Sequence, residues 1–412
     1  MRFEYSETKE KTLFKAILEN DETIEGIQAQ SPYPKMKLLN NILEINYVSK
    51  KKLHPDVIAA ICITCFYPWI KYSAKMPFPV SKTFARGLEM DILPQHEVID
   101  GIYRATKPIT IRNVNEFLQP YIGGSETVTA YGGGMDSTAI ALLFPEFPLI
   151  HSSNLNDSNE RKNVIKQYIK DNLKNDFYVI DSNCKKLTNI NDFTTFTNIF
   201  LIPLILSADL NIKNICCGEI LESSCMSTGV KYFPQFDPKR RNRWVRFYNK
   251  IGFNIFSPTG GLSSIITADI VYKHDLHLKA LYCEINKGDK CHNCIKCFRK
   301  GSELLKDETK DLKYWNGFNK QNMIKQLSRR PLPYANTVVY SVKNNKNLPD
   351  YFLETVKDLS HIQTDLFNRI YSKSFIYFPE DIKDKLISEL TKYADLMTEE
   401  EEKYLESWDL TK

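Results

Sequence analysis

Residues 126–144 read ETVTAYGGGMDSTAIALLF, and this stretch decides the fold that we expect. A short β-type run ends in Gly132, Gly133 and Gly134, and the chain then enters an alanine-rich segment with a helical pattern. Glycines allow positive φ angles and a close approach of backbone N–H groups, while a helix start adds unpaired donors and a dipole that favours anions. The stretch therefore predicts a phosphate-binding loop between a strand and a helix.

Met135, Asp136 and Ser137 follow the glycines at the predicted start of the helix. The Asp136 and Ser137 side chains stand where they cap the helix or contact a phosphate or its Mg²⁺. A glycine-rich turn with a capping aspartate is the alternative interpretation of the same residues. A Walker loop would end in Gly-Lys-Ser or Gly-Lys-Thr, and a dinucleotide fold would open with Gly-x-Gly-x-x-Gly, and this stretch has neither pattern.

Strand and helix patterns alternate on the C-terminal side of this loop. This alternation predicts an α/β fold in which a parallel sheet has helices on both faces. Ligands in such sheets bind at the carboxyl ends of the strands. The further strand patterns are FPLIHSS (147–153), DFYVIDS (176–182) and NIKNICCGE (211–219), and the helical patterns cover residues 137–144, 160–173 and 196–210.

The sequence divides into four parts. Residues 1–122 combine a β-rich start with a buried helical run and predict an N-terminal α+β extension. Residues 123–282 contain the phosphate loop and the alternating unit. Residues 283–300 hold a cysteine motif, and residues 301–412 are charged and helical in pattern, with prolines that break the helices.

The cysteine motif has the spacing C-x7-C-x2-C-x2-C, at Cys283, Cys291, Cys294 and Cys297. Four thiolates complete a tetrahedral zinc site, with sulfurs about 2.3 Å from the ion. Because a four-sulfur set leaves no position for water, a structural role for zinc is expected. A four-iron cluster and a set of incidental free thiols are the alternatives.

The composition is that of an ordinary globular protein, with 42% hydrophobic and 25% charged residues in a chain of 412. The net charge of +5 comes from 55 basic and 50 acidic side chains spread along the chain, which does not indicate duplex nucleic acid as the partner. The start of the chain carries charges throughout, and no stretch reaches the roughly 18 consecutive apolar residues of a membrane span. We therefore expect a cytoplasmic protein without a membrane partner.

Further candidates lie at and beyond the fourth strand pattern. Glu219, at its end, is a candidate for orienting a substrate amine or binding magnesium, with a structural hydrogen bond as the alternative. Cys216, Cys217 and Cys225 are interpreted as buried packing thiols rather than catalytic ones. The basic stretch at 239–247 predicts a solvated loop rather than a surface that grips an anionic substrate or single-stranded RNA.

Residues 132–137, GGGMDS, resemble the S-G-G-x-D-S signature of the PP-loop ATP pyrophosphatase superfamily, with a glycine in place of the first serine. Together with the cysteine knuckle, the loop is similar to the 7-cyano-7-deazaguanine synthase (QueC) family over about residues 126–300. The resemblance implies an adenine nucleotide α-hydrolase-like fold. It also implies cleavage of ATP between the α and β phosphates, with transfer of AMP to a carbonyl or carboxylate oxygen.

The same resemblance places adenine near the end of the second strand. The residues there are His151, Ser152, Ser153 and Asn154. A simple polar turn is the alternative interpretation of these four residues.

The chain departs from the QueC family in three ways. The family's substrate-recognition stretch after the fourth strand is not recognisable in residues 218–224, GEILESS. Thr267 precedes Ala268 and Asp269 where that family has a lysine before an alanine and an acid, and the x7 gap is one residue shorter than usual. We therefore expect a divergent QueC-like paralogue with a different acceptor.

The expected enzyme is a ligase-type adenylating enzyme that uses ATP, Mg²⁺ and structural Zn²⁺. Asp136, Ser137 and Glu219 are the expected catalytic residues. The acceptor would be a carboxylate or carbonyl of a small molecule or a protein, attacked after activation by ammonia or an amine. A non-catalytic nucleotide-binding scaffold, for example in an anti-phage system, and a tRNA- or sugar-modifying PP-loop enzyme are the alternatives. Partner proteins, a homodimer and nucleic acid binding stay open.

Overall fold

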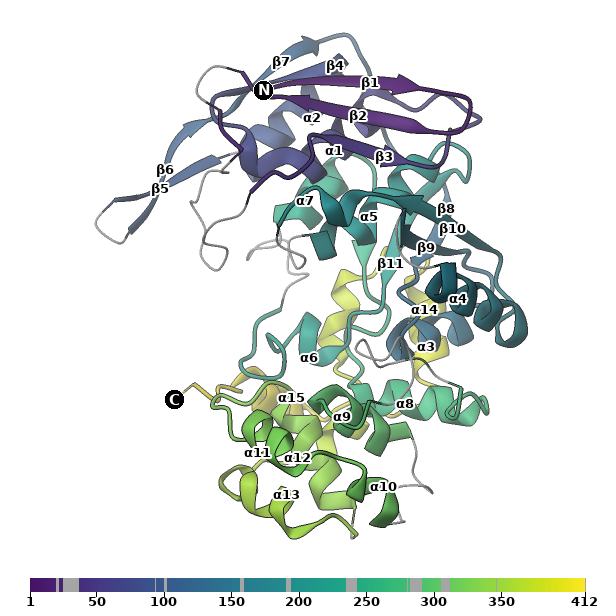
Figure 1. Cartoon of the computed structure of the whole chain (residues 1–412), viewed down its shortest axis with the longest axis vertical. Helices are drawn as coiled ribbons and strands as arrows, with labels where there is room; N and C mark the ends of the chain where they lie inside the picture. Colours follow the sequence, from purple (N-terminus) through teal and green to yellow (C-terminus); the bar gives the residue numbers. More distant parts are fainter. Residues whose placement is uncertain are drawn as a thin grey trace.

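A computed structural model of the chain shows a mixed α/β protein with a large sheet and a helical C-terminal region (Figure 1). The ten-stranded sheet has the order β12-β11-β8-β9-β10-β3-β2-β1-β4-β7, and β5 and β6 form a separate hairpin. The structure describes residues 1–19, 22–24, 37–92, 94–99, 102–155, 159–189, 194–234, 243–279, 281, 291–304, 312–345 and 347–411.

One end of the sheet is parallel and contains β12, β11, β8, β9 and β10. The chain runs outward from β8 to β9 and β10 and then returns to the other side of β8 with β11 and β12. In open sheets of this kind, ligands bind at the carboxyl ends of the strands where the order reverses. The strands are β8 (Glu126–Ala130), β9 (Leu149–Asn154), β10 (Phe177–Ser182), β11 (Ile212–Cys217) and β12 (Asn254–Phe256).

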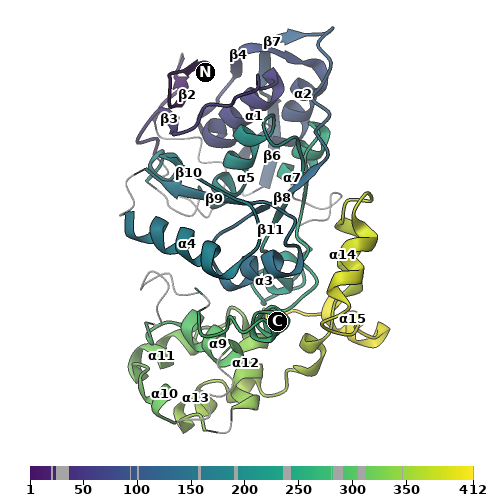
Figure 2. The same ribbon diagram turned by 90° about the vertical axis from the view of Figure 1, so that its right-hand side faces the viewer.

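Helices cover both faces of the parallel strands (Figure 2). Successive β11 side chains point to opposite faces: Ile215 and Cys217 pack into the core that contains α5 and α7, and Cys216 packs into the core that contains α3 and α8. The helices of this part are α3 (Met135–Leu143), α4 (Asn159–Asn172), α5 (Thr194–Leu206), α6 (Leu221–Ser224), α7 (Arg243–Lys250) and α8 (Ser264–Lys273).

The N-terminal part continues the same sheet. β1 pairs antiparallel with β2, and β2 with β3, while β1, β4 and β7 run parallel to one another. The buried helix α1 packs against this sheet and against α5. The elements are β1 (Arg2–Glu7), β2 (Thr12–Ile17), β3 (Ile42–Ile45), α1 (Pro55–Phe66), β4 (Ser73–Ser81), α2 (Lys82–Gly87), β5 (Pro94–Ile99), β6 (Ile102–Pro108) and β7 (Thr110–Asn115).

Asn183 joins the two halves of the sheet where β3 meets β10. Its side-chain Oδ1 accepts a hydrogen bond from the Glu44 backbone nitrogen at 2.8 Å, and its Nδ2 donates to the Ile42 carbonyl oxygen at 2.9 Å. The Asn183 backbone nitrogen also donates to the Glu44 carbonyl at 3.1 Å. The amide side chain therefore extends the strand pairing by one position beyond the end of β10.

The C-terminal helices pack on α3 and α8 through one apolar core. Phe298, Trp315 and Phe352 are fully buried in it, and Leu405 closes it from the last helix. A capping box of Thr398 and Glu401 begins that helix. The helices are α9 (Ile295–Leu304), α10 (Leu312–Asn316), α11 (Lys320–Leu327), α12 (Ala335–Asn344), α13 (Asp350–Thr355), α14 (Lys383–Leu390) and α15 (Glu399–Glu406).

The strands and helices expected around the glycine loop are present within a few residues of their predicted bounds. The prediction of a solvated loop for residues 239–247 is wrong for residues 243–247, which belong to α7. Val245, Phe247 and Tyr248 are buried there because they pack into the core beside α1 and α5. Residues 239–241 lie outside the described part. Among the described helices, none is both long and apolar enough to cross a membrane.

Replacing Asn183 by alanine should lower the free energy of unfolding by about 1–3 kcal/mol, because two side-chain hydrogen bonds are lost and the Glu44 N–H loses its partner. Urea unfolding of the full chain measures this. Asn344→Ala, which removes an exposed amide bonded only within its own helix, is the matched control. An equal loss of unfolding free energy in the two variants would contradict the role of Asn183 in joining β3 to β10.

Candidate functional site

The loops after β8 and β11 meet where the strand order reverses. Gly218 directly follows β11, and a Cβ atom added to it would lie 2.8 Å from the backbone nitrogen of Ser137. A glycine is needed for this close approach, which presses the end of β11 against the first turn of α3. The two loops therefore share the edge at which ligands bind in open α/β sheets.

The glycine loop has an open outer side. Gly133 has a φ of +77°, a left-handed conformation that strains a residue with a side chain. A Cβ atom added to Gly132 would meet no heavy atom of the described residues within 4 Å, and Gly132 is exposed. Gly134 is the N-cap of α3 and has no side chain to accept from the first-turn N–H groups. Those backbone donors and the helix dipole suit an anion.

The side chains of Met135 and Ser137 point away from the open side. Met135 packs in the core beneath α3. Ser137 Oγ donates a hydrogen bond to the Gly134 carbonyl oxygen at 3.0 Å, and Ser137 is buried. In this structure, these two residues therefore contribute their backbone rather than their side chains to the loop surface.

Asp136 is held by a buried cation. Its Oδ1 accepts hydrogen bonds from Lys300 Nζ at 2.7 Å and from Thr267 Oγ1 at 2.9 Å. The Lys300 side chain is 2% exposed and the Asp136 side chain 23%, so the accessible part of the pair is the carboxylate. Burial raises the pKa of Asp136, but the positive charges of Lys300 and Arg299 outweigh it and hold that pKa below its ordinary value. Asp136 is therefore ionised at neutral pH.

Lys300 reaches this position from α9, the helix that follows the cysteine motif. α9 packs against α8, which carries Thr267, and α8 packs against α3. Burial lowers the pKa of Lys300, and the charge of Asp136 opposes this effect. The structure thus brings a lysine from α9 next to Thr267, the position at which the resemblance to the QueC family implies a lysine.

Glu219 lies just after β11, near Asp136. Its backbone is fixed by the hydroxyls of Ser257 and Thr259, which donate to the Glu219 carbonyl oxygen at 2.5 and 2.8 Å. Burial raises the pKa of the Glu219 carboxyl, and the negative charge of Asp136 raises it further. Carboxylate oxygens are preferred ligands of Mg²⁺, so Asp136 and Glu219 are the candidate magnesium ligands at this edge.

A buried polar network lies behind the loop, between α6, α8, α9 and α12. Glu222 accepts hydrogen bonds from Asn336 Nδ2 at 2.8 Å and from the Ser264 backbone nitrogen at 3.2 Å. Ser264 Oγ donates to Glu303 Oε1 at 2.7 Å and accepts from Arg299 Nη1 at 2.9 Å. Ser264 lies in α8 with Thr267, and Arg299 lies in α9 with Lys300. The hydrogen bond between Ser264 and Arg299 therefore holds together the two helices that carry Thr267 and Lys300.

Glu303 is one of two members of this network with a buried side-chain oxygen that lacks a hydrogen-bond partner among the residues that the structure describes, the other being Asn336. In Glu303 this oxygen is Oε2. Burial raises the pKa of Glu303 to about 7, although the charges of Arg299 and Lys300 act in the opposite direction. This carboxyl therefore changes its protonation state near neutral pH.

His151, Ser152, Ser153 and Asn154 form the carboxyl end of β9. They pair with β10 in regular register, so they belong to a strand rather than to a polar turn. β8 pairs with β9 only at Leu149 and Ile150, and the four residues extend past the end of β8. His151 Nδ1 lies 2.8 Å from the Tyr131 carbonyl oxygen, which ties this strand end to the start of the glycine loop.

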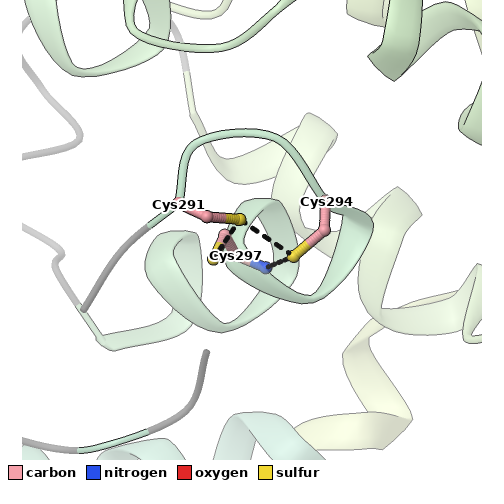
Figure 3. A group of neighbouring side chains, drawn as sticks. All are labelled: Cys291, Cys294 and Cys297. Atoms are coloured by element: carbon pink, nitrogen blue, oxygen red, sulfur yellow. Dashed lines mark hydrogen bonds between the residues drawn. The ribbon is translucent and has the colours of Figure 1, made fainter. Parts of the chain in front are cut away.

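Three cysteines gather at the start of α9 (Figure 3). Cys291 Sγ lies 3.5 Å from the sulfurs of both Cys294 and Cys297, and all three sulfurs lie within 4.8 Å of one another. Hydrogen bonding from Cys297 lowers the pKa of Cys294 to about 5, despite partial burial. Three converging sulfurs fit a thiolate-binding metal ion. Cys283, expected as the fourth ligand, lies outside the described residues.

Three further cysteines, two in β11 and one at the end of α6, are buried as expected for packing thiols. Cys216, Cys217 and Cys225 are buried, and burial raises the pKa of each thiol above its ordinary value. A thiol that stays protonated is a poor nucleophile.

The sequence analysis missed Lys300, Arg299, Glu222 and Glu303. One signal was available: Lys300 follows Cys297 by three residues, so a helix beginning at the motif carries both on one face. Nothing in the sequence pattern pointed to the contact of Lys300 with Asp136, since the two residues are 164 positions apart.

Comparison with known proteins covers only part of this site. Residues 243–409 match the model of a family of unknown function, DUF6395. The matched part contains α7 to α15 with Thr267 and Lys300, but neither the glycine loop nor Glu219. The match covers less than half of the chain, and because the function of the family is unknown, it indicates no activity. No curated protein matches the chain.

The three-cysteine cluster should bind one thiolate-favouring metal ion per chain. We expect Cys297→Ser to lose this ion, because a buried sulfur ligand is removed from the site. Elemental analysis of the purified protein gives the metal and its stoichiometry. Cys225→Ser, which changes a buried thiol remote from the cluster, should retain the ion, and metal-free wild-type protein would contradict the assignment.

Stability should depend on pH through Glu303. Its pKa is raised in the folded chain, so its contribution favours folding at low pH and is lost as pH rises through about 7. Glu303→Gln removes the titration while its amide oxygen still accepts from Ser264. Compared with wild type, the variant should therefore gain stability between about pH 5 and about pH 8. Urea unfolding across this range measures the difference, and a constant difference would be the contrary result.

Proposed function

We propose that the chain is an ATP-dependent adenylating enzyme of the PP-loop type, related to the QueC family. The observation that supports it most is the open glycine loop between β8 and α3, at the reversal of strand order and beside the end of β11. Backbone donors at a helix start favour an anionic group such as pyrophosphate. The resemblance of residues 132–137 to the PP-loop signature supplies the chemistry.

In this proposal, different residues around the loop bind the pyrophosphate and the adenine of ATP. The N–H groups of the loop and of the first turn of α3 would hold the departing pyrophosphate. Gly132 replaces the signature serine and removes one side-chain donor, but it leaves the backbone free to approach the phosphates. The strand end at 151–154 would border the adenine, because it extends past β8 beside the loop.

Asp136 and Glu219 fit a magnesium ion in the chemistry of their oxygens. Mg²⁺ bound there would neutralise charge that builds up on the phosphates. Asp136 is already ionised, as a metal ligand must be, and a bound cation would lower the raised pKa of Glu219. The cysteine cluster would hold zinc in a structural role, because its sulfur ligands are thiolates at the start of α9.

The proposed reaction joins the substrate carboxylate oxygen to the α-phosphorus of ATP while the bond to the pyrophosphate breaks. Ammonia or an amine then attacks the activated carbonyl, and AMP leaves with the electron pair of the broken C–O bond. The loop would assist the first step, since donors at the bound pyrophosphate would stabilise the negative charge that collects on this leaving group. The acceptor is a carboxylate of a small molecule or of a protein.

Release of labelled AMP and of pyrophosphate from α-labelled ATP tests this proposal. Wild type, Asp136→Asn and the control Asp381→Asn would be incubated with Mg²⁺ and candidate carboxylates, including 7-carboxy-7-deazaguanine. Asp381 also pairs with a lysine, but on the surface and away from the loop. We expect Asp136→Asn to lower AMP formation by about 100-fold and Asp381→Asn to leave it unchanged.

The other outcomes separate the competing functions. Nucleotide binding without AMP formation from any candidate would favour a non-catalytic scaffold. Failure of wild-type protein to bind ATP at all would remove the phosphate-loop assignment.

A further inference from the structure

Lys300 is a buried lysine at the edge of an open site. Its side chain is 2% exposed, and the one carboxylate within salt-bridge distance among the described residues is Asp136. Moving an ammonium group out of water costs several kcal/mol unless a partner compensates the charge. Lys300 is therefore a cation whose burial costs stability, and it lies beside the glycine loop. If its role were purely structural, two apolar residues in place of Lys300 and Asp136 would serve as well.

We propose that Lys300 is the side-chain cation of the phosphate site and exchanges Asp136 for a phosphate oxygen when a nucleotide binds. This inference rests on the proposed function, and it adds a residue to that site. Asp136 lies two residues beyond the glycines, in the first turn of α3, so a phosphate held by the loop lies next to the carboxylate that Lys300 contacts. A lysine carries its ammonium on a flexible four-carbon stem, so the ammonium can move from one partner to a neighbouring one.

The exchange keeps every charge paired. In the structure, Lys300 and the hydroxyl of Thr267 both bond to Asp136 Oδ1. When Mg²⁺ takes the Asp136 carboxylate, Lys300 loses its counter-ion and gains a phosphate oxygen in its place. Without such an exchange, an incoming triphosphate would meet the negative charge of Asp136 while Lys300 stayed paired with that carboxylate.

The neighbouring cation does not fill this role. Arg299 donates to Ser264 Oγ, and its guanidinium lies 4.0 Å from the centre of the Tyr334 ring. Those contacts hold it in the network behind the loop, among Glu222 and Glu303. Lys300 has a single carboxylate contact and a flexible chain, so it is the cation that is able to move.

The cysteine cluster lies at the start of α9, the helix that carries Lys300. Cys294 lies immediately before α9, and Cys297, in its first turn, precedes Lys300 by three residues, about one helical turn. Metal bound to these sulfurs would fix the position of α9 along its axis. The sulfur site at the start of α9 and Lys300 in the middle of α9 thus belong to one short helix.

Binding of three ligands to Lys300→Met measures this role by isothermal titration. The probes are α,β-methylene-ATP with Mg²⁺, inorganic pyrophosphate with Mg²⁺, and adenosine. Loss of one charge-assisted hydrogen bond should weaken the analogue and pyrophosphate by about ten-fold or more and leave adenosine unchanged. Lys300→Arg, which keeps the charge, should recover most of the affinity for the two phosphate ligands.

A double variant separates this role from a structural one. Lys300→Met alone leaves Asp136 without its cation and should lower stability, whereas Asp136→Asn with Lys300→Met removes both charges and should restore much of it. Phosphate affinity should stay low in the folded double variant. Recovery of phosphate affinity together with stability would overturn the proposal.

Two further results decide the matter. Unchanged pyrophosphate binding by Lys300→Met, with wild-type protein binding normally, would overturn the role of Lys300 and leave the adenylation proposal standing. Absence of analogue and pyrophosphate binding in wild-type protein would overturn both.

Discussion

The ion pair between Lys300 and Asp136 is the interaction on which the site depends. It joins the first turn of α3, at the glycine loop, to α9, which begins at the cysteine cluster. Because Lys300 is buried, the pair is stable only while both helices keep their places. The C-terminal helices pack on α3 and α8 and so act on the loop through the same contact. The loop, the sulfur cluster and the helical region are therefore connected through direct packing contacts.

The sequence predicted the parts of the site that are local in the chain. The glycine loop, the alternating strands and helices and the cysteine spacing are all short-range patterns, and the first two appear in the structure at the expected positions. The contact of Lys300 with Asp136 has no such pattern, since it depends on how α8 packs between α3 and α9. Residues 243–247 were mistaken for a loop because their charges hid the apolar side chains that face the core. The activity and the ligands stay predictions.

In the N-terminal part, too, the sequence indicated the local elements but not the long-range contacts between them. Its strands and buried helix were recognisable from apolar runs, but their pairing partner was not. Strand β3 joins β10 through the side chain of Asn183, and an amide that imitates a backbone looks like any loop asparagine in the sequence. The parallel unit therefore gains a protected edge at β10. The reversal of strand order at β8 lies on the other side of β9, where the glycine loop stays open.

The most direct measurement is a crystal structure of the full chain with α,β-methylene-ATP and Mg²⁺. The account predicts phosphates over residues 132–137, adenine beside the end of β9 at 151–154, and Mg²⁺ at Asp136. A nucleotide bound elsewhere, or bound at this edge with its phosphates turned away from the glycine loop, would contradict it.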